Sequence, residues 1–159
     1  MALEIERKFL LCNEDWRDQV TRTRRIRQAY MVDAIGENSR ASVRIRIDDE
    51  AANINIKSAT IGVQRQEYEY PIPLEDAERM IASLCHLPCI EKLRHIVEYQ
   101  GHRWEIDEFY GDNQGLIVAE IELSALDEIF VRPPWLGREV SDDARYYNVN
   151  LLRHPYRRW

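Results

Sequence analysis

The stretch Glu4-Ile5-Glu6-Arg7-Lys8-Phe9-Leu10 places a charged side chain at every second position. In an extended strand, alternate side chains point to opposite faces of the sheet. Glu4, Glu6 and Lys8 therefore share one face, and Ile5 and Phe9 share the other. This period of two predicts a β-strand with one charged face and one apolar face.

The same period recurs along the chain and predicts an antiparallel β protein. Gln100 to His102 and Gly111 to Gly115 have the composition of turns, as does Ile35 to Ser39. The predicted strands are Glu4 to Leu11, Arg25 to Val32, Arg40 to Asp48, Asn53 to Lys57, Gln66 to Ile72, Cys89 to Tyr99, His102 to Phe109 and Leu116 to Leu123.

Three short helices are predicted beside these strands. Asn13 is the expected cap of a helix from Glu14 to Val20. Leu74 to Leu84 follows Pro73 and carries acidic residues in its first turn, as helices often do. A third helix is expected at Tyr146 to Leu152. The 159 residues are read as one domain of class α+β, residues 1–159, with about eight strands and a few helices.

The composition of the chain limits the kinds of binding partner that it can have. The formal net charge of −6 argues against a nonspecific nucleic-acid binder, whose surface is net basic. No apolar run approaches the roughly 20 residues of a membrane helix. The charged segment that begins at Glu4 predicts no signal peptide, and an odd number of cysteines, 3, favours reduced thiols and a cytoplasmic location.

Charge is sorted by strand, which is unusual for a solvated sheet. The first and last predicted strands present acids, Glu4 and Glu6 at one end and Glu120 and Glu122 at the other. The strands between them present bases. The bases are Arg44, Arg46, Lys57, Lys92 and Arg94. An exposed sheet normally mixes charges and pairs them across strands.

Closing the sheet into an eight-stranded antiparallel barrel with these faces inward brings the acids together opposite the bases. Such a barrel has room for a small ligand. Buried charges require polar partners, and a polyphosphate with a divalent cation supplies oxygens for Arg and Lys and a metal for the carboxylates. The sequence therefore predicts a tunnel that binds a triphosphate.

The stretch Glu4-Ile5-Glu6-Arg7-Lys8 resembles the E-x-E-x-K signature of the CYTH superfamily, the triphosphate tunnel metalloenzymes. Matches continue over nearly the whole chain, and the chain is most similar to the short bacterial inorganic triphosphatases. The matching segments are Arg44 with Arg46, Lys57, Glu67 to Pro73, Lys92 to Arg94, Trp104 to Phe109, Leu116 to Leu123, Gly137 to Ser141 and Arg145 to Asn148.

The resemblance implies a closed barrel, Mg or Mn as the cofactor, and hydrolysis of the terminal phosphate of a triphosphate. Glu4, Glu6 and Glu122 are the expected metal ligands, with Glu120 next, because hard carboxylate oxygens suit such cations. The bases are the expected phosphate-binding and catalytic residues. These are Lys8, Arg44, Arg46, Lys57, Lys92 and Arg94.

Other residues receive weaker assignments. Glu67, Glu69 and Asp107 face the interior by parity and are expected to orient the bases. Arg27 and Arg65 are minor candidates, and Tyr146 and Asn148 are expected mainly to pack. The spacing in Cys85 to Cys89 does not predict a zinc site, since it lacks a second ligand pair.

Two other classes of function remain open at this point. An adenylate cyclase or a thiamine triphosphatase would use the same kind of tunnel. A noncatalytic sensor of polyphosphate or nucleotide would need a similar basic wall. The expected partner is a small-molecule triphosphate, with no nucleic acid and no membrane, and a homodimer is compatible with this reading.

Overall fold

The computed structural model describes residues 3–34, 36 and 38–159. Nine strands account for most of the chain. They are β1 (Leu3–Leu11), β2 (Val20–Asp33), β3 (Ala41–Asp48), β4 (Ala51–Ser58), β5 (Gln64–Ile72), β6 (His86–Tyr99), β7 (His102–Phe109), β8 (Ile117–Glu122) and β9 (Leu136–Glu139). The helices are α1 (Leu74–Leu84) and α2 (Asn148–Leu151), with 3-10 turns η1 (Asp15–Gln19), η2 (Gly111–Asn113), η3 (Ala144–Tyr146) and η4 (Tyr156–Arg158).

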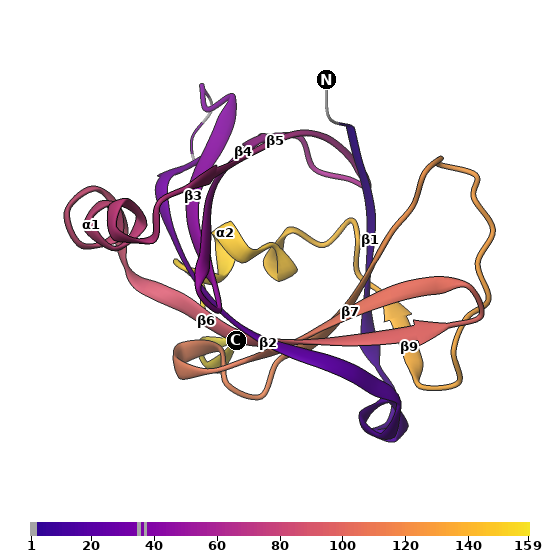
Figure 1. Ribbon diagram of the computed structural model, residues 1–159. Helices are drawn as coiled ribbons and strands as arrows, with labels where there is room; N and C mark the ends of the chain where they lie inside the picture. Colours follow the sequence, from indigo (N-terminus) through magenta and orange to yellow (C-terminus); the bar gives the residue numbers. More distant parts are fainter. Residues whose placement is uncertain (1–2, 35, 37) are drawn as a thin grey trace.

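Eight strands close into the predicted antiparallel barrel. The sheet runs in the order β5-β4-β3-β2-β6-β7-β8-β1-β9, and an added pairing of β5 with β1 closes the ring. Figure 1 looks into this ring, with α1 outside the wall and α2 seen across the opening. The closing seam is short: Leu3, Glu4 and Ile5 pair with Gln66, Arg65 and Gln64. Beyond it, β1 pairs with β9 at Phe9 and Leu11.

The apolar cores lie outside the barrel wall, because the polar faces of the strands point inward. Helix α1 buries Ala77 and Ile81 against a cluster that includes Ile45 of β3 and Ala52 of β4. A second cluster contains Phe9, Trp16, Trp104 and Trp135, on the outer face of β1 and β7. Burying this apolar area stabilises the wall at roughly 25 cal/mol per Å². The flanking elements therefore hold together a barrel whose own interior is charged.

The C-terminal segment forms a third cluster with the barrel. Tyr146 and Leu151 are buried with Val118 of β8 and Phe109 of β7. Trp159 stacks edge-on against Tyr146, with ring centroids 5.0 Å apart, so the end of the chain is docked. This packing carries residues 147–149 to the barrel opening.

Several element boundaries differ from the sequence prediction. β2 begins at Val20 rather than Arg25, and β6 begins at His86 rather than Cys89. The helix expected at Glu14 to Val20 is the 3-10 turn η1, and Asn13 accepts a hydrogen bond from the Asp15 N–H instead of capping an α-helix.

The C-terminal helix is shorter than expected and spans Asn148–Leu151. β9 was not predicted. The turn expected at Ile35 to Ser39 includes residues 35 and 37, which lie outside the described residues. None of the helices in the described part of the chain has the length and apolar character needed to span a membrane.

Candidate functional site

A polar cavity of about 230 Å³ occupies the barrel interior. Eight carboxylates and seven cationic side chains line it, and the apolar contribution is small. The carboxylates are Glu4, Glu6, Asp48, Glu67, Glu69, Glu105, Glu120 and Glu122, and the cations are Lys8, Arg24, Arg44, Arg46, Lys57, Arg65 and Arg94. So many charges in one lumen require either mutual pairing or a polar ligand. Some of these charges form ion pairs with one another, and others do not.

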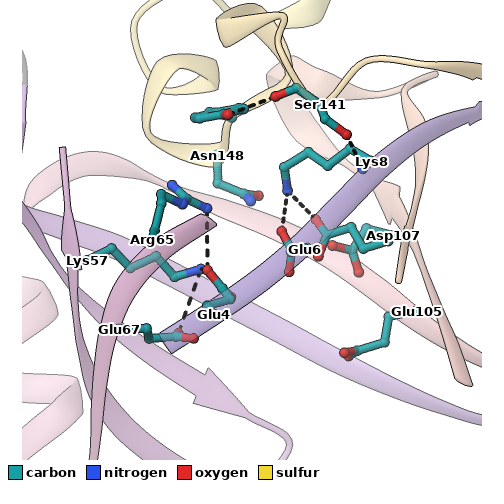
Figure 2. A network of polar contacts seen from close by, with 12 residues as sticks. Glu4, Glu6, Lys8, Lys57, Arg65, Glu67, Glu105, Asp107, Ser141 and Asn148 are labelled. Atoms are coloured by element: carbon teal, nitrogen blue, oxygen red, sulfur yellow. Dashed lines mark hydrogen bonds and ion pairs between the residues drawn. The ribbon is translucent and has the colours of Figure 1, made fainter. Parts of the chain in front are cut away.

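Lys8 is held between two acids of the barrel wall. Its Nζ lies 2.7 Å from Glu120 of β8 and 2.9 Å from Glu6 of β1, as Figure 2 shows for Lys8 and Glu6. Burial opposes the charge of Lys8, but Glu120 and Glu6 outweigh it and raise the pKa of the ammonium. Burial likewise opposes the Glu120 charge, yet Lys8 and Arg94 bring the pKa of that carboxyl well below its ordinary range.

A second paired group crosses the closing seam. Lys57 of β4 donates to both carboxylate oxygens of Glu4 on β1, each at 3.0 Å, and lies 3.6 Å from Glu67. Arg65 of β5 reaches Glu4 at 3.6 Å, and Figure 2 shows Lys57 and Arg65 converging on this carboxylate while Glu67 contacts Lys57. Glu4 thus links strands on both sides of the seam.

Lys92 and Arg94 share one fully buried carboxylate. Arg94 binds Asp107 through two nitrogens at 2.8 Å, and Lys92 Nζ lies 2.6 Å from the same carboxylate. Asn148 accepts a further hydrogen bond from Lys92 at 3.2 Å. Burial, and then the nearby Arg94 charge, lower the pKa of Lys92 to about 7. Lys92 and Asp107 are buried and are not among the residues lining the cavity, so the ammonium of Lys92, expected at the phosphate, is held by Asp107 and Asn148 beneath the lumen surface.

Arg44 and Arg46 of β3 are the least compensated cations. Within the described residues Arg44 forms no hydrogen bond or ion pair, and its buried Nε has no partner. Arg46 makes one long contact, donating to Gln28 Oε1 at 3.3 Å. Burial, followed by repulsion from Arg44 and Arg94, lowers the pKa of Arg46 to about 10. These two guanidinium groups form a positive wall that an anion would neutralise.

Glu122 of β8 is the corresponding uncompensated acid. It stands opposite Glu6 in the β1–β8 register, and in the described part of the chain it has no hydrogen bond or ion pair. Desolvation, then the negative charges of Glu4 and Glu6, raise the pKa of Glu122. A carboxylate destabilised by neighbouring carboxylates is relieved by a cation. The donor set at Glu122 and Glu6 therefore fits a hard divalent ion.

Among the described residues, no three His, Cys, Asp or Glu side chains are grouped closely enough to hold one ion. The reason is visible in the ion pairs, because Glu4 is drawn to Lys57 and Glu120 to Lys8 and Arg94. Glu122 has no ion pair among the described residues and Glu6 has one, with Lys8, whereas Glu120 contacts both Lys8 and Arg94.

The structure adds three charged lumen residues that the sequence did not indicate, namely Arg24, Asp48 and Glu105. Arg24 of β2 lies 3.0 Å from Asp48 and 3.6 Å from Glu105. Glu105 also contacts Arg94 at 2.8 Å. Arg27, a minor candidate, instead lies on the outer wall and pairs with Glu78 of α1.

The C-terminal segment also contributes to the cavity. Tyr147, Asn148 and Val149 line it, whereas Tyr146 is buried in the outer core. The Tyr147 hydroxyl accepts from the Gly62 N–H at 2.9 Å and lies 2.8 Å from the Ser141 carbonyl. Its ring lies 5.0 Å from the Arg65 guanidinium and 5.8 Å from Lys8 Nζ. Asn148, expected mainly to pack, therefore has a polar role beside Lys92.

The chain matches the CYTH domain model over residues 2–156. It is 40% identical over 157 residues to an inorganic triphosphatase of Acetivibrio thermocellus, covering 99% of this chain and 97% of that protein. It is 32% identical over 153 residues to an inorganic triphosphatase of Nitrosomonas europaea, covering 93% and 95%.

Solved structures show the same architecture. The crystal structure of the inorganic triphosphatase NE1496 matches with a TM-score of 0.66 and 30% identity, covering 94% of this chain and 97% of that chain. The PH1012 protein from Pyrococcus horikoshii matches with a TM-score of 0.58, covering 78% of this chain and 80% of that chain. Its 17% identity supports the fold alone.

Proposed function

The chain belongs to the CYTH domain family, and on this premise we propose that it is a divalent-metal-dependent hydrolase that removes the terminal phosphate of inorganic tripolyphosphate. The relatives at 40% and 32% identity, both inorganic triphosphatases, support this substrate. The observation that carries the proposal is the placement of unpaired charge in the lumen. Within the part of the chain that the structure describes, Arg44 and Arg46 have no carboxylate partner on one wall, and Glu122 has no cation partner on another.

Arg44 and Arg46 bind the phosphate oxygens in this proposal. A guanidinium offers two parallel donors to a phosphate, and both groups point into the lumen without a competing carboxylate. Negative charge spreads over the oxygens of the transferring phosphoryl group during hydrolysis. Fixed cations that contact those oxygens stabilise the transition state more than the ground state. Lys8, Lys57 and Arg94 extend this field but are shared with acids.

Glu6 and Glu122 would hold the metal, with Glu4 exchanging its contact with Lys57 for the cation. Mg²⁺ or Mn²⁺ bound there would neutralise phosphate charge and lower the pKa of an attacking water. Glu120 stays with Lys8 and Arg94 and keeps those cations in place. Asp107, buried beneath the lumen surface, acts likewise on Arg94 and Lys92.

The interior favours an inorganic substrate over a nucleotide or thiamine ester. Among the lining residues, Tyr30, Tyr147 and Val149 are the ones with substantial apolar groups, and the rest are charged or polar. A nucleobase or thiazolium ring binds most strongly to aromatic or apolar faces. A cytoplasmic location belongs to the same proposal and rests on the odd number of cysteines, 3.

The test measures phosphate release by chelator-stripped protein from tripolyphosphate, thiamine triphosphate and ATP, with and without added Mg²⁺ or Mn²⁺. Metal-dependent release that is fastest from tripolyphosphate is the expected result. Arg46→Ala should lose at least about 100-fold in kcat/KM, as expected for removal of a transition-state contact. Arg27→Ala is the matched control, since Arg27 lies on the outer wall.

Two outcomes would overturn the proposal. Release of cyclic AMP and pyrophosphate from ATP, without phosphate release from tripolyphosphate, would assign the tunnel to a cyclase. Tight binding of tripolyphosphate with no turnover at any metal concentration would make the protein a binder.

A further inference from the structure

An amide, rather than an acid, stands beside Arg44 on the neighbouring strand. Arg44 on β3 stands opposite Asn55 on β4, and Asn55 stands opposite Glu69 on β5. The three side chains form one row across three strands. Neighbouring strands lie roughly 4.8 Å apart, so Arg44 and Glu69 are separated by about twice that distance at the backbone. Both side chains are long enough to meet across this gap.

Four of the five other lumen cations stand directly opposite an acid; the fifth, Arg24, faces Arg94 and pairs with Asp48 and Glu105. Lys8 faces Glu120 in register, Arg94 faces Asp107, Lys57 faces Glu67, and Arg65 faces Glu4. All four pairs form ion pairs, at 2.7, 2.8, 3.6 and 3.6 Å. By contrast, Arg44 lies between Tyr30 and Asn55, and Arg46 lies between Gln28 and Asn53. Neutral neighbours on both sides thus coincide with the two uncompensated cations.

Asn55 holds the nearby acids on its far side. Its Nδ2 donates to Glu67 Oε1 at 3.2 Å and to Glu69 Oε2 at 3.0 Å. Asn53 donates to the other oxygen of Glu69 at 3.1 Å. Because an ionised carboxylate only accepts hydrogen bonds, these contacts fix the amide with its NH₂ toward the glutamates. Asn55 is 1% exposed, so the surrounding protein holds its side chain in this orientation.

We propose that Asn55 is a positioning residue that keeps Glu67 and Glu69 away from Arg44 and so leaves this guanidinium free for a phosphate oxygen. The proposal rests on the triphosphate site described above and goes beyond it, because it assigns the availability of the anion site to a neutral amide. Asn53 supports the same arrangement by holding the second oxygen of Glu69. The charge of Glu69 still reaches Arg46 electrostatically, although no ion pair between them is formed among the described residues.

The experiment is a double-mutant cycle on tripolyphosphate binding, measured by calorimetry in the presence of a chelator so that no hydrolysis intervenes. Asn55→Ala removes both donors and should weaken binding about tenfold, because a freed carboxylate then competes for Arg44. Glu69→Gln removes the competing charge and should bind more tightly than the wild type. The combined N55A/E69Q variant should recover most of the loss.

A matched comparison comes from Asn53→Ala. Asn53 faces Pro71 rather than an acid in the β4–β5 register, and Glu69 keeps its bond to Asn55 in this variant. Its loss of affinity should be clearly smaller than that of N55A. Thermal unfolding by circular dichroism checks that each variant folds. If N55A does not fold, Asn55→Ser and N55S/E69Q carry the same comparison, since serine cannot span both carboxylates.

Equal weakness of N55A and N55A/E69Q would overturn the proposal, because the amide would then act through packing or direct ligand contact. A crystal structure of N55A gives a readout that needs no substrate: a carboxylate of Glu67 or Glu69 within 4 Å of Arg44 is expected, and unchanged glutamates would also overturn the proposal. Wild-type protein that does not bind tripolyphosphate would instead count against the proposed function, and the structure of N55A would still decide the role of Asn55.

Discussion

Glu6 of β1 and Glu122 of β8 stand directly opposite each other on neighbouring strands of the barrel, although both carry negative charge. Like charges at opposed positions of a sheet are destabilising. Glu6 is compensated by Lys8 Nζ at 2.9 Å, whereas Glu122 has no such partner in the described part of the chain. The fold therefore places an exposed carboxylate beside like charges, and a bound cation would relieve their repulsion.

Glu122→Gln should separate metal binding from stability. The amide keeps the shape but removes the repulsion with Glu6, so the metal-free variant should unfold at a slightly higher temperature than the wild type. Metal-dependent phosphate release should fall by about 100-fold or more, because a charged ligand is lost. Glu98→Gln on the exposed end of β6 is the control. Unchanged metal dependence in E122Q would remove Glu122 from the metal site.

The raised pKa of Glu122 predicts a pH dependence with a defined sign. The folded protein holds this proton more tightly than the unfolded chain does. In the metal-free protein the Glu122 contribution to stability should therefore fall as pH rises from the ordinary carboxyl pKa, about 4.3, through the raised value. Metal affinity should rise over the same window, because the metal displaces the proton. Urea unfolding and metal titration of wild type and E122Q check this, since E122Q should lack both trends.

Truncation of Arg46 should mainly weaken ligand binding, whereas truncation of Arg94 should mainly lower stability. Arg46→Ala removes an uncompensated charge, so ligand binding should weaken while stability changes little. Arg94→Ala leaves the fully buried Asp107 without its two-pronged partner. Loss of one member of a buried ion pair typically costs about 3–5 kcal/mol. Chemical denaturation should therefore show a large loss for R94A alone, and equal losses in both variants would contradict this division.

The sequence predicted the barrel well because its strands alternate strongly. The charged face of β3, with Arg44 and Arg46, has a period of two over its whole length. Both ends of the observed strand lie within one residue of the predicted ends. β9 was missed because it is four residues long and follows Pro133 and Pro134, which weaken a strand pattern. Its pairing with β1 depends on tertiary packing rather than on local preference.

The site was only partly predictable for similar reasons. Arg24 was missed because the predicted strand began at Arg25, while β2 begins at Val20. Asp48 and Glu105 continue the parity of Arg46 and Asp107, so the alternation could have indicated both. The depth of Lys92 was not accessible, because its partner Asn148 lies 56 residues away in sequence. The alternation shows which face of the strand a side chain lies on, but its burial depends on the distant segment that covers it.

Tyr147→Phe should weaken the barrel beside its short seam. The Tyr147 hydroxyl contacts Gly62, in the loop before β5, and Ser141, which follows β9. It thereby ties the C-terminal segment to the barrel near the point where β1 and β5 stop pairing. Its loss leaves the partly buried Gly62 N–H and the buried Ser141 carbonyl without this partner, which should cost about 1–3 kcal/mol in chemical denaturation.

The same change should affect substrate binding more than turnover. The Tyr147 ring lies against Arg65 and Lys8, two lumen cations, and the phenyl ring of Y147F keeps that contact but loses its anchor. KM for tripolyphosphate should therefore rise about threefold to tenfold with a smaller change in kcat. Tyr156→Phe is the matched control, because among the described residues the Tyr156 hydroxyl has no hydrogen bond and the residue packs on Trp159. Equal effects of Y147F and Y156F on stability and KM would show that the hydroxyl of Tyr147 does not anchor the seam.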